Sequence, residues 1–216
     1  MGFLNKMGWG KEEEKARVLE HPRDLQMGDM VEFSIMPQMQ LSNKTMEVVD
    51  IWTLNYGNSS HKQVYFNLRD IDQKIRLRVV DNDTLEVAIS VLPEQLIQVF
   101  DEDDIGYILD TESGVNHHLY AKISDSAALP VELSGWITQQ YRQEGFEIAY
   151  RYNNDYRDKS IPDYSDAGEV ECDYAWLVSD DRQYSVEFRV FDGGRTEVHL
   201  CAMVPLRKIE SLWPAA

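Results

Sequence analysis

Alternation of apolar and polar residues with a period of two runs through most of the chain after residue 29 and predicts β-strands separated by turns. In the first half, the predicted strands are 30–35, 45–54, 62–69, 74–80 and 85–92. In the second half, they are 117–123, 170–178, 184–191 and 196–204. This pattern predicts a β-dominated α+β fold, built from antiparallel meander sheets or half-barrels with a few short helices.

The register of the first meander follows from requiring one apolar face, since a slip of one residue turns every side chain to the other face. The pairs that satisfy this requirement are Phe66–Leu77, Leu68–Ile75, Val79–Leu85 and Leu77–Val87. The same register sets Arg78 opposite Glu86, and an opposite-charge pair supports it. It gathers four cations on the other face, which we expect to be exposed to solvent: Arg69, Lys74, Arg76 and Arg78.

These four residues, called the basic patch below, reverse the local charge of an acidic chain. They form a candidate binding site for an acidic partner or an anion. In the alternative interpretation the patch is structural, and Glu47, Asp50 or Glu86 on neighbouring strands balances its charge. The sequence leaves both interpretations open.

The C-terminal third predicts a hairpin around two glycines. A three-residue loop, Asp192–Gly194, pairs Phe188 with Val198 and supplies the positive φ that such a loop commonly needs. Extending this sheet to the preceding strand predicts two apolar rows, Tyr174–Phe188–Val198 and Trp176–Val186–Leu200. In that register Cys172 lies on the core face and Cys201 on the opposite one, so they cannot form a disulfide within the sheet.

Three segments, 11–21, 93–100 and 134–144, have helical patterns. The first is rich in helix formers, the second begins with a proline, and the third is flanked by Ser134 and Gly145, which are typical of helix ends. We divide the chain into an N-terminal segment 1–23, partly disordered or helical, a meander 24–100 and a second β-rich half 101–216. Whether the two halves form one continuous domain is left open.

Composition and charge narrow the function without assigning it. The chain has 216 residues, 43% hydrophobic content and a net charge of −17, which fits a folded protein and disfavours nucleic-acid binding. No run approaches the roughly 20 apolar residues of a spanning helix, and the first ten residues lack the apolar block of a secretion signal. Two cysteines without metal-type spacing favour a reducing, cytoplasmic location.

Recognisable catalytic and cofactor motifs are missing from the sequence. His117 and His118 are adjacent on a predicted strand and therefore point to opposite faces, so they cannot chelate one metal ion together. The Asp- and Asn-rich stretches do not match a calcium loop, and there is no glycine-rich phosphate loop. We expect no metal or cofactor and assign no catalytic residue.

Three stretches, "MGFLNKMGWGKEEE", "LQMGDMVEF" and "YAWLVSDDRQYSVEFRVFDGGRTEVHL", resemble a bacterial family of uncharacterised proteins typified by YjfK, a domain of unknown function. The resemblance covers essentially the whole chain and carries over no active-site residue. It implies a cytoplasmic bacterial protein. Relatives of that family are often encoded near a phage-shock-protein-A-like protein and small membrane proteins, which implies an envelope-associated role.

Together these observations favour a non-enzymatic interaction or scaffold protein with an unidentified protein partner, serving an envelope-stress or membrane-associated system. Weak peripheral contact of the first ten residues with a membrane belongs to the same hypothesis. The alternative is a hydrolase or a small-molecule-binding protein whose site lies between the two β-rich halves. That site would use His117 or His118 and the tyrosine-rich loop after residue 150. The oligomeric state does not follow from the sequence.

Overall fold

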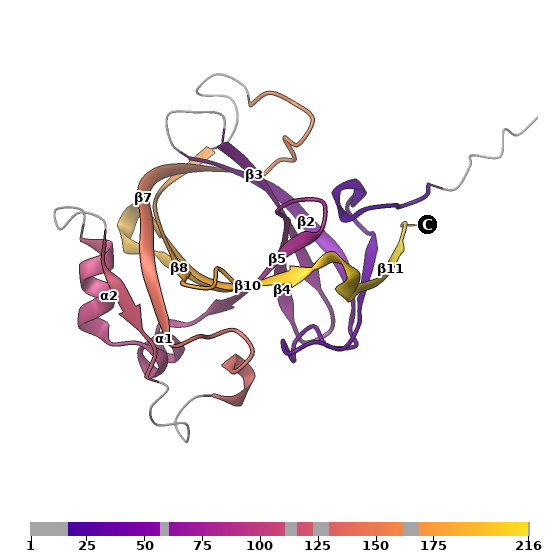
Figure 1. The fold of residues 1–216 in the computed structure, drawn as a ribbon. Helices are drawn as coiled ribbons and strands as arrows, with labels where there is room; N and C mark the ends of the chain where they lie inside the picture. The colour runs from indigo at the N-terminus through magenta and orange to yellow at the C-terminus, as the bar shows by residue number, and fades with distance from the viewer. Residues whose placement is uncertain (1–16, 57–60, 111–115, 123–129, 162–168, 216) are drawn as a thin grey trace, which may run out of the picture.

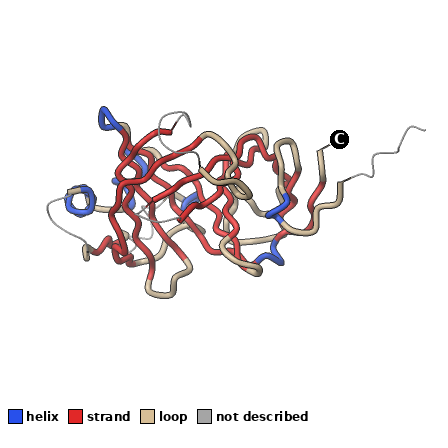
Figure 2. Tube along the Cα trace, turned by 90° about the horizontal axis from the view of Figure 1, so that it is seen from above, coloured by secondary structure: helices blue, strands red, loops and turns tan. Residues whose placement is uncertain are grey.

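The computed structural model describes residues 17–56, 61–110, 116–122, 130–161 and 169–215. Most of these residues are in strands, and the helical segments are short (Figure 2). The strands are β1 (Met30–Phe33), β2 (Thr45–Tyr56), β3 (His61–Arg69), β4 (Lys74–Val79), β5 (Thr84–Val91), β6 (His118–Tyr120), β7 (Gln140–Tyr152), β8 (Glu169–Ser179), β9 (Tyr184–Phe191), β10 (Thr196–Pro205) and β11 (Ile209–Trp213). The helices are α1 (Pro93–Val99) and α2 (Glu102–Leu109), and 3-10 turns occur at Pro22–Asp24, Val131–Leu133, Asp192–Gly194 and Leu206–Lys208. The predicted β-rich α+β class is confirmed.

The strands form one antiparallel sheet in the order β11-β1-β2-β3-β4-β5-β10-β9-β8-β7-β6. In addition, the end of β2 pairs with the end of β7, from Thr53–Tyr152 to Tyr56–Ala149. This pairing closes the eight strands from β2 to β7 into a barrel (Figure 1). Strands β1 and β11 extend the sheet on one side of the barrel, and β6 lies on the other side with α1 and α2. Strands from both halves of the sequence therefore share one sheet.

The outer face of the barrel carries the larger apolar core. The register predicted for the first meander is confirmed, since Phe66–Leu77, Leu68–Ile75, Leu77–Val87 and Val79–Leu85 are paired residues. Their side chains join one cluster with residues of β8, β9 and β10, and with Leu96 and Val99 of α1. The predicted helix over 93–100 is confirmed by α1, which begins at Pro93. Alternate residues of the same strands face the interior of the barrel.

The helix predicted over 134–144 is wrong, because β7 begins at Gln140. Tyr141 and Gln143 are buried while Arg142 between them is exposed, which is the period of a strand. The buried positions Trp136, Ile137 and Tyr141 fit a helical face as well, so the short apolar pattern was ambiguous. Tertiary pairing with β6 and β8 decides the outcome.

Three further differences concern the helices and the chain ends. Helix α2, whose first turn contains Glu102, Asp103 and Asp104, was not predicted from the sequence. Residues 17–20 of the predicted N-terminal helix are not helical, and residues 11–16 lie outside the described ranges. Strand β11 was not predicted; it adds to β1 from Met30–Trp213 to Phe33–Ile209.

The register of β8 against β9 differs by one residue from the prediction. Phe188 pairs with Ala175 instead of Tyr174, and Val186 pairs with Leu177 instead of Trp176. The connection between these strands contains Arg182 at a φ of 57°. A non-glycine residue rarely adopts this conformation, so the sequence of the connection does not predict it. The slip turns the aromatic side chains of β8 from the outer core to the barrel interior.

Asp29 is a fully buried carboxylate that joins the two ends of the described chain. It accepts hydrogen bonds from the backbone nitrogens of Gln26 at 2.6 Å and Ala215 at 2.9 Å, and forms an ion pair with Arg17. We expect Asp29→Ala to lower the free energy of unfolding by about 2–3 kcal/mol, because buried donors lose a charged acceptor. Urea denaturation measures this change. Asp72→Ala, at an exposed turn, is the control and should change stability by less than about 0.5 kcal/mol; equal effects of both substitutions would contradict the role of Asp29.

Candidate functional site

The interior of the barrel is lined by charged and aromatic side chains. On β3 and β4, the inward positions include Tyr65, Arg76 and Arg78, and on β9 they include Glu187 and Arg189. Arg76 on β4 forms an ion pair with Glu187 on β9 at 2.7 Å, although β5 and β10 separate these strands in the sheet. Side chains so far apart in the sheet can meet only across the interior.

Five ionic residues form a continuous network, called the charge layer below: Arg76, Arg78, Glu86, Glu187 and Arg189. Arg78 binds Glu86 at 2.5 Å, and Arg189 binds Glu187 at 2.9 Å. Tyr174 donates a hydrogen bond to Glu187 at 3.0 Å. Four of the five residues are almost completely buried, and Arg78 is partly exposed at one end of the layer.

Aromatic rings form cation–π contacts with the guanidinium groups of the charge layer. The Arg76 guanidinium lies 4.5 Å from the centre of the Tyr65 ring, and that of Arg189 lies 4.9 Å from the Trp52 ring. Trp52 and Tyr65 are themselves stacked at 4.4 Å. Cation–π contacts of this kind are strongest where water is excluded, so the rings help to fix the orientation of the charge layer.

The charges of the layer and burial keep Glu187 ionised and the nearby side chains of Cys201 and His199 neutral. Burial would raise the pKa of Glu187, but the guanidinium groups of Arg76, Arg189 and Arg78 outweigh burial and hold this pKa at about 2. Burial, reinforced by the Glu187 and Glu86 carboxylates, raises the pKa of the Cys201 thiol well above its usual value. Burial and the charges of nearby arginines lower the pKa of His199 well below its usual value. Cys201 is therefore a neutral thiol and not an activated nucleophile.

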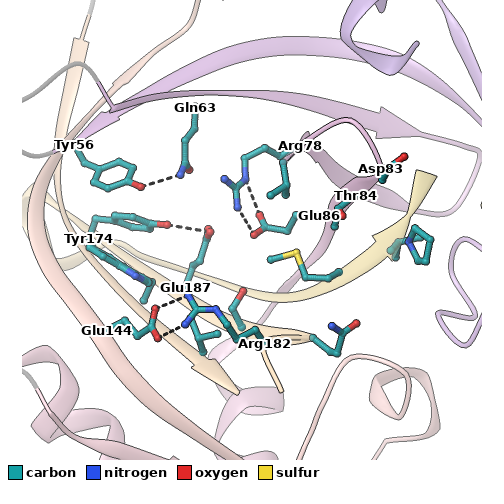
Figure 3. A pocket seen from close by; sticks show the side chains of 18 residues that line it. Tyr56, Gln63, Arg78, Asp83, Thr84, Glu86, Glu144, Tyr174, Arg182 and Glu187 are labelled. Atoms are coloured by element: carbon teal, nitrogen blue, oxygen red, sulfur yellow. Dashed lines mark hydrogen bonds and ion pairs between the residues drawn. The ribbon is translucent and has the colours of Figure 1, made fainter. Parts of the chain in front are cut away.

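One mouth of the barrel opens into a cavity of about 590 Å³, called the Tyr174 pocket below (Figure 3). Tyr56 from β2 and Tyr174 and Trp176 from β8 form its aromatic wall, with ring centres 5.2–5.6 Å apart. Arg78, Glu86 and Glu187 form the charged wall and belong to the charge layer. The Glu144–Arg182 ion pair, with distances of 2.8 and 3.0 Å, lies at the entrance.

Trp176 can occupy this position because β7 has a glycine opposite it. Gly145 pairs with Trp176, and a β-bulge lies between Gln143 and Gly145. A Cβ atom added at Gly145 would lie 2.0 Å from Cη2 and 2.1 Å from Cζ2 of the indole ring, much closer than van der Waals contact. The glycine that was expected to end a helix instead leaves space for an aromatic residue of the pocket.

The other mouth holds a second cavity of about 330 Å³, called the Arg76 cavity below. Asp50, Asn67, Lys74, Arg76, Ser90 and His199 provide its polar lining. Asn67 donates a hydrogen bond to Asp50 at 2.9 Å. Because antiparallel strands alternate in direction, the ends of β3 and β5 lie here, whereas their beginnings lie at the Tyr174 pocket.

The four residues of the predicted basic patch lie in two different environments. Arg69 and Lys74 are exposed neighbours, while Arg76 is 4% exposed and Arg78 is paired with Glu86 as the register predicted. Arg76 and Arg78 thus lie on the expected face, but this face encloses the barrel interior and is not the solvent-exposed surface that the sequence suggested. Glu47 pairs with Arg69 in the sheet, and Asp50 binds Asn67.

The other sequence candidates lie elsewhere. His118 is exposed and stacks with Tyr120, and His117 stacks with Tyr107, both outside the barrel interior. Cys172 and Cys201 are both buried and both face the interior, so their predicted placement on opposite faces is wrong. This error follows from the one-residue difference in the register of β8 against β9, which places Cys172 in the barrel interior and not on the outer core face.

Glu86, Glu187 and Cys201 place potential metal-ligating atoms within 4.8 Å of one another. Each carboxylate is already bound by guanidinium groups, and Arg76 also donates to the Cys201 sulfur at 3.4 Å. A cation would have to displace these positive charges, so the cluster favours internal ion pairs over a metal.

Tyr174, Trp176 and Glu187 were missed as site residues. The sequence pattern that could have identified them is the recurrence of aromatic or charged residues at every second position of β8 and β9, on the face opposite the aliphatic residues. The one-residue slip in the predicted register hid it by assigning both aromatic side chains to the outer core.

Comparison with protein-family models, curated proteins and solved structures found no match. The resemblance to the YjfK-like family therefore stays a prediction. In the part of the chain that the structure describes, no helix has both the length and the apolar character to cross a membrane.

Proposed function

We propose that this protein is a small-molecule-binding protein whose ligand, a compact organic cation with a planar or apolar body, occupies the Tyr174 pocket. The observation that carries the proposal is an open cavity of about 590 Å³ in a closed barrel, with an aromatic wall facing a charged one. Barrels of eight strands have room for packed side chains or for one small ligand, and ligand sites occur at barrel mouths.

The composition of the interior supports a functional role. Burying ion pairs costs several kcal/mol of desolvation, and replacing them by well-packed apolar residues is often neutral or stabilising. A barrel interior built only for stability therefore does not need the charge layer. The charge layer borders an open pocket, which favours a role for the layer in binding.

The charge and rings of the pocket favour a cation. In its lining, Glu86 is paired with Arg78 and Glu144 with Arg182, and Glu187 is paired with Arg76 and Arg189, so Asp83 is the lining carboxylate outside these ion pairs. Three aromatic rings offer cation–π contacts, and the net charge of −17 raises the local concentration of cations.

A binding role without catalysis fits the interior groups. The low pKa of Glu187 makes it a weak base, and the high pKa of Cys201 leaves its thiol neutral. Neither group is matched to proton transfer or nucleophilic attack near neutral pH. The proposal adopts the small-molecule alternative, with a site between the two halves of the sequence, but moves the site from the histidines to strands β2–β5 and β7–β10.

The interaction or scaffold role in an envelope system stays a prediction with less support. Of the four patch residues, Arg69 and Lys74 are the ones exposed to a protein partner. The cytoplasmic location and the peripheral membrane contact of the N-terminus also stay predictions, and residues 1–16 lie outside the described ranges.

Calorimetric titration with phenethylamine tests the proposal, with phenethyl alcohol as the neutral analogue. We expect saturable one-to-one binding of the amine and at least about tenfold weaker binding of the alcohol, a difference of about 1.4 kcal/mol. Tyr56→Leu should weaken amine binding about threefold to tenfold, since it removes one ring of the wall.

Tyr120→Leu is the matched control, because Tyr120 is an exposed tyrosine on β6, outside the pocket. It should leave the affinity unchanged. Equal binding of amine and alcohol would contradict recognition of a cation, and no saturable binding of the amine would overturn the proposed ligand class.

A further inference from the structure

The Arg76 cavity contains buried donors that the described protein atoms leave without acceptors. The Arg76 side chain is 3% exposed, and its Nη2 atom binds Glu187 at 2.7 Å and Glu86 at 3.4 Å. Its Nε and Nη1 atoms are buried and have no hydrogen-bond partner in the described part of the chain. Nδ1 of His199, which lines the same cavity, is also buried without a partner there, and it is a further donor in the tautomer that carries the proton on Nδ1.

Leaving a buried charged donor without a hydrogen-bond acceptor lowers the stability of the folded protein. Arg189 contributes two further atoms of this kind, Nε and Nη1, from the adjacent part of the interior. Native proteins satisfy nearly all such groups. An acceptor that enters beside Arg76 would therefore recover part of this cost.

Charge balance indicates what kind of acceptor fits. Four guanidinium groups of the interior, from Arg76, Arg78, Arg151 and Arg189, face three paired carboxylates, from Glu86, Glu187 and Glu197, and the exposed Arg195 also pairs with Glu197. The paired groups therefore have an excess of at least one positive charge. At the mouth of the cavity Lys74 and Asp50 carry opposite charges that cancel. The excess positive charge of the interior therefore remains and favours an anion of low charge.

We infer that the Arg76 cavity binds a small oxyanion, a carboxylate or a phosphate, at the barrel mouth opposite the Tyr174 pocket. Arg76 supplies the buried donors, and Lys74 and Ser90 supply an ammonium and a hydroxyl at the exposed edge. The Asp50 carboxylate lines the same cavity and repels an anion, which places the anion towards Arg76 and His199. The protein's overall negative charge acts over longer distances and is screened by salt.

Amide NMR of the full chain tests this inference, with sodium acetate and sodium phosphate as probes and sodium chloride at equal ionic strength as the reference. We expect saturable shifts at Ala88, Ser90 and His199, which line the cavity. Saturation by acetate alone assigns a carboxylate site, and saturation by phosphate alone assigns a phosphate site. Shifts no larger than those with chloride would overturn the inference.

The double variant Lys74→Gln/Ser90→Ala changes exposed residues and leaves the charge layer intact. It should weaken oxyanion binding about tenfold, since it removes one ion pair and one hydrogen bond. Arg69→Gln is the matched control, because Arg69 pairs with Lys74 in the sheet but does not line the cavity. An equal loss in the control would show attraction by general surface charge and would contradict a site. Phenethylamine binding at the other mouth is measured separately, so the two proposals can fail independently.

Discussion

Replacing Glu187 by glutamine is expected to lower the free energy of unfolding by about 3–5 kcal/mol near pH 7, because it leaves buried guanidinium groups without their counter-charge. Glu187 is 3% exposed and binds Arg76 at 2.7 Å and Arg189 at 2.9 Å. Glutamine retains the shape and one hydrogen-bonding oxygen but not the charge. Urea denaturation of both proteins measures the difference.

This difference should depend on pH in a defined direction. The folded-state pKa of Glu187 is held at about 2, below its ordinary value of 4.5. The carboxylate therefore contributes its full stability above about 4.5, and this contribution is lost as the pH falls towards about 2. The stability gap between wild type and Glu187→Gln should narrow over the same interval, because the protonated acid resembles the amide. A gap that stays constant down to pH 3 would contradict the ion-pair explanation.

Glu171→Gln provides the matched control, since Glu171 is an exposed glutamate on β8. The same chemical change there should alter stability by less than about 0.5 kcal/mol. A loss as large as that of Glu187→Gln would mean that net charge, and not the charge layer, determines stability.

Gly145→Ala is expected to destabilise the protein by about 1–3 kcal/mol or more and to abolish phenethylamine binding, because overpacking forces neighbouring side chains from their positions. The new methyl group would overlap the Trp176 ring, which forms part of the aromatic wall of the Tyr174 pocket. Thermal unfolding and calorimetric titration measure the two effects.

Gly106→Ala is the control for this substitution. Gly106 lies in α2, and a Cβ atom added there meets nothing within 4 Å. Alanine should stabilise the helix by about 0.5–1 kcal/mol and leave ligand binding unchanged. If Gly145→Ala retains both stability and binding, the close contact between β7 and Trp176 does not shape the pocket.

The sequence by itself determined which neighbouring residues share a face. The pairs Phe66–Leu77 and Leu68–Ile75, and the three-residue loop that pairs Phe188 with Val198, are confirmed. The reason is that short hairpins leave few possible registers, and the requirement for one apolar face selects among them. The register of β8 against β9 was predicted with an error of one residue, because the connection between them contains a positive φ at Arg182 that the sequence did not predict.

Only the tertiary structure decided what the polar face of the strands encloses. Alternation places Arg76, Arg78 and Glu187 opposite the apolar core but cannot distinguish a solvent-exposed face from a barrel interior. That distinction depends on the pairing of β2 with β7, between segments far apart in the sequence. Closure brings β4 opposite β9 and turns a predicted surface patch into a buried charge layer with a cavity at each mouth, because burial is a property of the whole sheet and not of any one strand.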